Sequence, residues 1–211
     1  NDMIPALDET KLYYTGDHTS FSVNKTSIVA GNYLTLKGRI DFKPEYASAV
    51  SGVNMVVDLP ESCSFVENSV MVGTKVSGYT LDGGRLTIPM ENYRDDVRFC
   101  VIPTDGGTYA PSAFAQFTLN GQEVQQPIGN ASYEVKDLSI NVPPTVAKTT
   151  VSIHGTAVGK SAIKIYDNGN LIGETTSLAN GLWNTTCELD EPYNLSRHSI
   201  YAMVTTSQGV E

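Results

Sequence analysis

Apolar and polar residues alternate along three stretches in the first half of the chain. Residues 33–40 place Leu34 and Leu36 on one side of the alternation and threonine and lysine on the other. Residues 53–59 and 96–101 repeat this pattern with valine, methionine, leucine and phenylalanine at every second position. A period of two is typical of a strand that turns one face to a core. The pattern therefore predicts three half-buried strands.

Three glycine-containing turns separate further pairs of alternating segments. Residues 82–84 read Asp-Gly-Gly, and residues 120–121 and 168–169 both read Asn-Gly. Asn-Gly favours type I′ turns, in which both central residues have positive φ, and such turns join antiparallel strands. We expect a β-hairpin at each of the three positions.

The one candidate helix is short. Residues 44–50 begin with Pro44, which suits a first helical turn, and Gly52 follows them. Short strands separated by turns about every ten residues are typical of antiparallel sandwiches. The fold class predicted is all-β, with two antiparallel immunoglobulin-like β-sandwiches in tandem.

The domain boundary is predicted near Pro143-Pro144. Alternation stops between Lys136 and Thr145 and restarts at Val151, and two prolines stiffen a junction. A chain of 211 residues suits two domains of roughly 100 residues. We predict a first sandwich over residues 1–138 and a second over 139–211. The first 18 residues are ambiguous, since residues 11–14 fit either an opening strand or a tail.

The net charge excludes several classes of partner. The chain has 14 Lys and Arg against 23 Asp and Glu, a formal charge of −9, with a pI of about 4.7. A binder of nucleic-acid backbones or of anionic membranes needs a basic face. No apolar run approaches the roughly 20 residues of a membrane-spanning helix. We expect no nucleic acid partner and no membrane insertion.

No signal peptide is visible, so we expect a mature chain or a fragment.

The first half of the chain resembles a known module. Residues 53–70 run from a strand into Asp58, Leu59 and Pro60, then to Phe65 and to a Ser-Val pair. Residues 85–89, 97–101 and 130–133 follow in matching order. This resembles a repeat domain of Gram-positive surface proteins, of the Asp-x-Leu-Pro type, over about residues 34–135. The resemblance implies a stalk module without chemistry.

The second half resembles a different module. Residues 155–161, 165–173, 179–183 and 198–202 are similar, in order and content, to the bacterial immunoglobulin-like domain found in tandem in large adhesins. The resemblance covers residues 151–209 and implies that Trp183 is a packing residue. It also implies a final strand after residues 207–209, which Val210 and Glu211 would begin. We therefore expect the second domain to be truncated at its C-terminus.

Motifs for nucleotide binding and nucleophilic catalysis fail on spacing. Residues 159–161 read Gly-Lys-Ser, but a phosphate-binding loop needs an earlier glycine at a position that holds His154, and a strand rather than a helix follows. His18, His154 and His198 are too scattered for a metal site. No Gly-x-Ser-x-Gly sequence occurs.

Two acidic clusters are the remaining candidates for chemistry. Residues 95–96 and 188–191 carry carboxylates that could serve glycoside hydrolysis or bind Ca²⁺. Both lie at strand edges or loops, where solvated charge is the ordinary outcome. We predict no catalytic residue, no cofactor-binding residue, no metal ligand and no cofactor.

Cys63, Cys100 and Cys187 lack the spacing of a metal or redox motif. Strand parity puts Cys63 in an apolar slot between Leu59 and Phe65, so we expect it to be buried and reduced. A Cys63–Cys100 disulfide is the alternative.

The function predicted is a non-catalytic structural or adhesive segment, a stalk or spacer, of a large bacterial cell-surface or secreted protein. Its expected partners are the neighbouring domains of the same chain, with a host or glycan ligand left open. The alternative is a carbohydrate-binding accessory module of a secreted glycan-degrading enzyme. That alternative needs an aromatic patch, for which the first domain offers these residues: Tyr13, Tyr14, Tyr46, Tyr79, Tyr93 and Tyr109.

Overall fold

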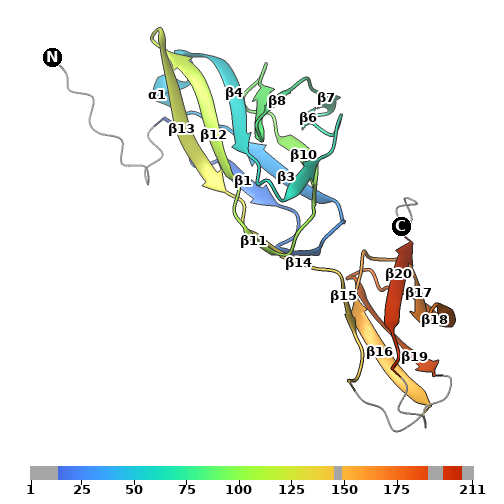
Figure 1. Ribbon diagram of the computed structural model, residues 1–211. Coiled ribbons are helices and arrows are strands. Elements are labelled where there is room, and N and C mark those ends of the chain that lie inside the picture. The colour runs from blue at the N-terminus through green and yellow to red at the C-terminus, as the bar shows by residue number, and fades with distance from the viewer. Residues whose placement is uncertain (1–13, 145–148, 190–196, 206–211) are drawn as a thin grey trace. The chain divides into compact units, whose positions relative to one another are not determined.

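The computed structural model describes residues 14–144, 149–189 and 197–205, and its contacts divide the chain into two units (Figure 1). Unit 1 holds residues 14–26, 33–102 and 108–134. Unit 2 holds residues 27–32, 103–107 and the described residues from Val135 onward. The boundary at 138/139 stays a prediction. Almost all regular structure is antiparallel strand, which confirms the predicted fold class.

Unit 1 is a sandwich of two sheets. The first has the order β1 (Ser20–Val23), β3 (Leu34–Arg39), β10 (Val97–Pro103), β6 (Met71–Val72) and β7 (Lys75–Val76), with β5 (Cys63–Phe65) also paired to β10. The second has the order β13 (Gln122–Asn130), β12 (Ser112–Leu119), β4 (Val50–Asp58), β9 (Arg85–Pro89) and β8 (Thr80–Asp82). A small third sheet, which belongs to neither sandwich, has the order β11 (Gly107–Tyr109), β14 (Tyr133–Lys136) and β2 (Ser27–Val29).

The three predicted alternating segments are strands with one buried face. In β3 the side chains of Leu34 and Leu36 are fully buried, while Lys37 is exposed. The same alternation buries Phe99 in β10 and Met55 in β4. The apolar faces of the two sheets supply the core of unit 1, and the polar positions between them face solvent.

The strand order of unit 1 is immunoglobulin-like. The β1-β3-β10 order corresponds to the A-B-E strands of that fold, and the β13-β12-β4 order corresponds to G-F-C. The short hairpins β6-β7 and β8-β9 extend the two sheets beyond this shared part.

All three predicted hairpins are present. They join β8 to β9, β12 to β13 and β17 (Ala162–Asp167) to β18 (Asn170–Thr176). Asn120 and Gly121 have φ of 52° and 80°, and Asn168 and Gly169 have 48° and 88°. Positive φ at both central residues is what a type I′ turn requires, so the local sequence determined these turns.

The predicted helix over residues 44–50 is too long. Helix α1 covers only Pro44–Ala47, with the proline in its first turn, and β4 already begins at Val50. Gly52 does not end the helix. It lies inside β4 with a φ of 58°, where the pairing between β4 and β12 shifts register. The glycine therefore accommodates a β-bulge.

Unit 2 is a smaller sandwich of two three-stranded sheets. One has the order β15 (Ser139–Asn141), β16 (Thr150–Thr156) and β19 (Leu182–Glu188), and the other has the order β18, β17 and β20 (Ile200–Thr205). These correspond to the A-B-E and C′-C-F strands of an immunoglobulin-like sandwich.

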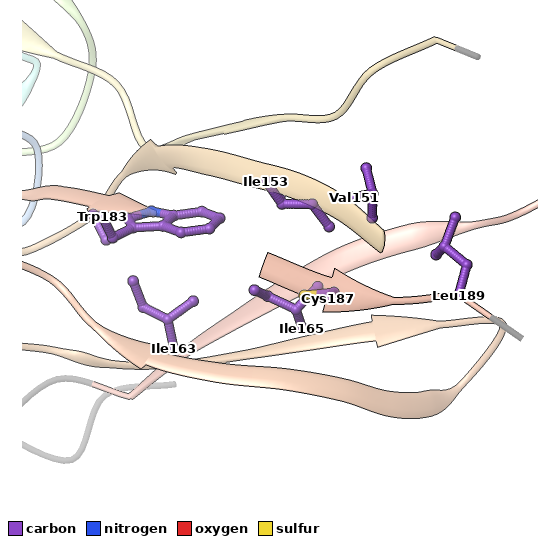
Figure 2. Close-up of a cluster of buried hydrophobic side chains, with 8 residues drawn as sticks. Val151, Ile153, Ile163, Ile165, Trp183, Cys187 and Leu189 are labelled. Atoms are coloured by element: carbon purple, nitrogen blue, oxygen red, sulfur yellow. The ribbon is translucent and has the colours of Figure 1, made fainter. Parts of the chain in front are cut away.

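The core of unit 2 is a cluster of buried aliphatic residues around one tryptophan (Figure 2). Ile153 from one sheet and Ile163 and Ile165 from the other are at most 1% exposed. Trp183 is 4% exposed and lies against this cluster, as a packing residue should. Its indole Nε1 is buried without a hydrogen-bond partner among the described residues.

Among the described residues, the strand β20 has a partner on one side only. In unit 1 the F-type strand β12 lies between β4 and β13, whereas β20 pairs with β17 alone within the described residues. The core-facing residues Ile200, Ala202 and Val204 are only partly buried. The final strand predicted from residues 207–211 lies outside the described part of the chain.

Candidate functional site

Three strands of unit 1 place hydrophilic side chains on the outer face of the first sheet. Because the leucines of β3 point into the core, Lys37 and Arg39 point outward. In the register of the sheet, Lys37 lies opposite Ser22 of β1 on one side and opposite Arg98 of β10 on the other. Arg39 lies opposite Ser20.

These side chains surround a hollow of about 250 Å³. We call it the basic hollow and define it by its polar lining: Ser20, Ser22, Lys37, Arg39, Asp96 and Arg98. Its lining therefore carries three cations, two hydroxyls and one carboxylate.

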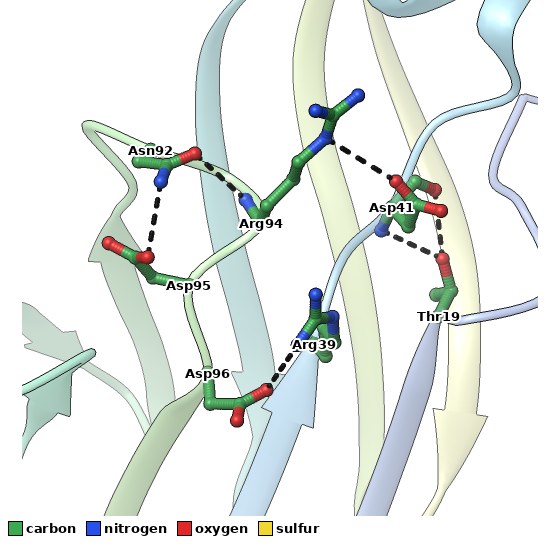
Figure 3. A network of polar contacts seen from close by, with 7 residues as sticks. All are labelled: Thr19, Arg39, Asp41, Asn92, Arg94, Asp95 and Asp96. Atoms are coloured by element: carbon green, nitrogen blue, oxygen red, sulfur yellow. Dashed lines mark hydrogen bonds and ion pairs between the residues drawn. The ribbon is translucent and has the colours of Figure 1, made fainter.

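Two residues of this lining, Arg39 and Asp96, form an ion pair (Figure 3). The guanidinium of Arg39 lies 3.3 Å from the carboxylate of Asp96, with side chains 42% and 73% exposed. The Nε of Arg39 is buried and has no hydrogen-bond partner among the described residues. Lys37 and Arg98 form no ion pair within the described part of the chain. Among the described residues, two of the three cations therefore have no ion-pair partner.

The predicted acidic pair at residues 95–96 is not a carboxylate dyad. Asp95 accepts a hydrogen bond from the side-chain amide of Asn92 at 3.1 Å, while Asp96 pairs with Arg39 (Figure 3). The neighbouring Asp41 lies 3.8 Å from the Nε of Arg94. Each carboxylate has its own partner, so the arrangement is that of a polar surface network.

The second acidic cluster is only partly described. Glu188 is exposed and Leu189 is buried, while residues 190–191 lie outside the described part. Within the described ranges, no three His, Cys, Asp or Glu side chains gather closely enough to hold a metal ion. None of the described helices is long and apolar enough to span a membrane.

The three histidines lie apart. His18 and His154 are exposed in different units. His198 contacts Asp167, with 2.5 Å between Nδ1 and Oδ2, and the carboxylate is 6% exposed. The backbone N–H of Ser199 also donates to the side chain of Asn168 at 3.1 Å. These contacts tie the start of β20 to the β17-β18 turn, so His198 serves local packing.

The Gly-Lys-Ser segment at 159–161 is a turn that leads into β17. Lys160 has a φ of 61°, and the backbone N–H of Ser161 donates to the hydroxyl of Ser177 at 2.9 Å. The backbone N–H that a phosphate-binding loop would offer to a ligand is thus already used.

All three cysteines are free thiols, and the alternative Cys63–Cys100 disulfide is absent. Cys187 is buried, whereas Cys63 is half-buried, which corrects the prediction that Cys63 is buried. The three-residue strand β5 leaves Cys63 and Phe65 only partly covered. The Cys63 thiol donates to the carbonyl of Pro60 at 3.1 Å, and desolvation by burial raises its pKa from 9.0 to about 11.

The tyrosines of unit 1 do not form one patch. Tyr46, Tyr14 and Tyr93 belong to one series of edge-to-face contacts that runs through Phe117 and Phe42, with ring centroids 4.8–5.8 Å apart. Apart from it, Tyr79 packs edge-to-face on Phe65 and Tyr109 lies tilted against Tyr133, at 4.9 and 5.7 Å. Tyr13 lies outside the described residues. These rings serve packing within unit 1.

An aromatic pair that the sequence did not indicate lies in unit 2. Tyr166 of β17 and Tyr201 of β20 are opposite one another and stack, with centroids 5.2 Å apart and planes 12° apart. Tyr201 is 43% exposed, and Leu171, opposite Tyr166 on β18, is 50% exposed. Only the register between strands brings these residues into one row.

Comparison with known proteins gives structural likeness alone. No family model and no curated protein matches the sequence. The 35 kDa C-terminal fragment of the major pilin GBS80 of Streptococcus agalactiae aligns at 9% identity over 88% of this chain and 90% of that chain, with a TM-score of 0.45.

Two further solved structures align with similar sequence identities and TM-scores. The full-length major pilin SpaD of Corynebacterium diphtheriae aligns at 14% identity over 81% of this chain and 51% of its own, with a TM-score of 0.46. The pilus 2b backbone protein of group B streptococcus aligns at 11% identity over 90% and 91%, with a TM-score of 0.41. At these sequence identities and TM-scores, the role of this chain has to be argued from its own residues.

Proposed function

We propose that this chain is a non-catalytic structural or adhesive segment, a stalk or spacer, of a large bacterial protein that is secreted or carried on the cell surface. The observation that carries the proposal is the succession of two immunoglobulin-like sandwiches in one chain. Each has its own hydrophobic core, so modules of this kind extend a chain without needing a ligand to fold.

The state of the polar groups supports a structural role. The carboxylates of Asp41, Asp95 and Asp96 and the histidine His198 are all engaged with neighbours on the surface or between strands. A catalytic centre needs a convergent set of groups left available to a substrate. The described residues offer polar contacts that hold strands and turns together instead.

The proposal also covers the type of each module, its partners and its location. The sequence resemblances suggest a Gram-positive surface repeat domain of the Asp-x-Leu-Pro type for the first module and an adhesin-type domain for the second. The neighbouring domains of the same protein are then its permanent partners, and its place is outside the cell.

Proteolytic shaving of intact cells tests the location. Brief trypsin treatment of the living source organism should release peptides of this chain into the supernatant, where mass spectrometry identifies them. A cytoplasmic enzyme of the same organism serves as the control for lysis. Peptides found only after cell disruption would contradict the proposal.

The carbohydrate-binding alternative retains one observation in its favour. The row formed by Leu171, Tyr166 and Tyr201 is an exposed apolar and aromatic strip on the outer face of unit 2. A glycan array with the wild-type chain and Tyr201→Ala tests it. Binding to neutral glycans that disappears in this variant would favour the accessory module over the spacer.

A further inference from the structure

Two like charges face each other across adjacent strands at the basic hollow. Lys37 and Arg98 are directly paired in the antiparallel register of β3 and β10. Like charges in this arrangement destabilise a sheet, and neither side chain has an ion pair among the described residues. Arg39 adds a third cation to the same lining. The hollow is thus a positively charged site on a chain whose net formal charge is −9.

The lining consists mainly of hydrogen-bond donors. Lysine and arginine only donate, and serine hydroxyls at Ser20 and Ser22 donate or accept. A complementary ligand therefore carries acceptor oxygens and negative charge. The planar guanidinium groups of Arg39 and Arg98 match the two oxygens of a carboxylate or sulfate group.

One feature of the lining favours a ligand that also donates hydrogen bonds. The carboxylate of Asp96 contacts Arg39 through Oδ1, and its side chain is 73% exposed. An exposed carboxylate beside three cations repels a bare anion but accepts hydrogen bonds from hydroxyl groups. Hydroxyls and an anionic group on one molecule are characteristic of acidic sugars.

Size and surroundings exclude other classes of ligand. The hollow of about 250 Å³ lies below the roughly 300–1,000 Å³ of typical drug-sized sites. Besides its six polar residues it is lined by two glycines and Val97, which gives a peptide no deep apolar anchor. A nucleic acid requires an extended basic surface that this acidic chain lacks.

We propose that the basic hollow binds a single acidic sugar unit, whose carboxylate or sulfate group lies between Lys37, Arg39 and Arg98. The serines of β1 and the carboxylate of Asp96 then contact its hydroxyls. This goes beyond the proposed function, because a spacer needs no ligand. It gives unit 1 an adhesive role of its own.

The test is a titration of the full chain, followed by isothermal calorimetry or NMR, in buffer of low ionic strength. The probes are 3′-sialyllactose for the carboxylate, a heparin-derived disaccharide for the sulfate, hexaglutamate as an acidic peptide, and lactose as the neutral control. We expect one or both acidic probes to bind at millimolar concentrations, more weakly as salt is added, and lactose not to bind. The stronger acidic probe identifies which anionic group is preferred.

Two substitutions address the site directly. Lys37→Ala and Arg98→Ala each remove an exposed, unpaired cation, so both variants should fold, and relief of the like-charge contact should raise their thermal stability slightly. Each should weaken binding of the acidic probe about tenfold. The matched control is Lys136→Ala, which removes an exposed lysine that does not line the hollow.

Several results would overturn the proposal: no binding of either acidic probe, equal binding of lactose, or unchanged affinity in both hollow variants. Tighter binding of hexaglutamate than of either sugar would assign the hollow to acidic peptides instead. None of these results would affect the spacer role, which the cell-shaving experiment tests separately.

Discussion

At the scale of single residues, two acids of unit 1 are held in their neutral forms by burial. Desolvation raises the pKa of Cys63 to about 11, and it raises that of Tyr133 to about 12, with further contributions from Cys63 and Tyr109. Both groups are acids that lose a proton to become charged, and a partly buried site disfavours that charge. This neutral state has consequences for reactivity and for stability.

The Cys63 thiol should alkylate slowly. Only the thiolate is nucleophilic, and raising the pKa from 9.0 to about 11 reduces the thiolate fraction at pH 8 about 100-fold. Labelling with iodoacetamide at pH 8, followed by tryptic mass spectrometry, should show Cys63 reacting about 100-fold more slowly in the native chain than in urea. Equal rates would mean that the thiol is solvated in the native chain.

Unit 1 should lose stability in alkaline solution. A group with a raised folded-state pKa stabilises the fold fully below its unfolded pKa, and this contribution is lost as pH rises through the folded value. For Cys63 that window runs from about pH 9 to about pH 11. Thermal unfolding monitored by circular dichroism should show a midpoint for unit 1 that falls across this window. In Cys63→Ala the fall should be shallower, and an identical slope would assign the effect to other groups.

Strand parity predicts the face of a residue but not how far that face is covered. It placed Cys63 and Phe65 on the inner side of a strand, yet both are half-buried because β5 is only three residues long. The contact between Asp167 and His198 was beyond prediction for another reason. It joins the last residue of β17 to a residue just before β20, and no sequence motif links these two positions.

At the scale of elements, the pairing of β15 with β16 depends on one glycine. A Cβ atom at Gly155 would lie 1.9 Å from the carbonyl oxygen of Ser139 and 2.7 Å from the Trp183 ring. Such distances are impossible for real atoms, so any side chain here pushes β15 away from β16 or displaces the tryptophan. The smallest residue is therefore what allows the two strands to pair beside the core.

Gly155→Ala should destabilise unit 2 by about 1–3 kcal/mol or more, the usual cost of forcing an extra methyl group into a packed region. In a domain of about 70 residues this lowers the melting temperature by roughly 4–8 °C per kcal/mol. Trp183 fluorescence followed during thermal unfolding measures this fall in the melting temperature of unit 2. The control for adding a methyl group is Gly78→Ala in unit 1, where a Cβ meets nothing within 4 Å, and its melt followed by circular dichroism should be close to that of wild type. A melt equal to that of wild type would show that β15 does not pack as described.

Strands and hairpins were predictable because their signals are local. The alternation in β3 and the Asn-Gly turn after β12 each lie within a few consecutive residues. The basic hollow was not predictable, since it depends on which strand lies beside which and in what register. Lys37 and Arg98 are paired only because β10 lies against β3. The stacked pair Tyr166 and Tyr201 was not predictable either, because it depends on the register between β17 and β20.

At the scale of the whole molecule, the two units have cores of unequal size. The core of unit 2 is a single small cluster around Trp183, and its residues on β20 are only partly covered. Unit 1 buries the faces of a six-stranded and a five-stranded sheet against each other. Small domains bury a smaller fraction of their surface and are correspondingly less stable.

Denaturation should therefore proceed in two steps, with unit 2 unfolding first. Trp183 is the only tryptophan of the chain, so its fluorescence reports on unit 2 alone, whereas circular dichroism reports on both units. In a urea titration the fluorescence transition should come first, and circular dichroism should show a second transition at higher urea. A single transition that coincides in both signals would mean that the units unfold together.

The short strand β15 also determines how the chain responds to mechanical load. It is joined to β16 by three residue pairs, whereas β16 is joined to β19 by seven. When a stalk is pulled from its ends, the three pairs at Ser139, Ile140 and Asn141 should therefore separate before the seven pairs that join β16 to β19. Their release should lengthen the chain by up to roughly 3.5 Å per freed residue while β16 and β19 stay paired. The second module should thus extend stepwise under load, first uncovering the side of the core on which Ile140 and Val142 pack and only later losing its longer strand pairs.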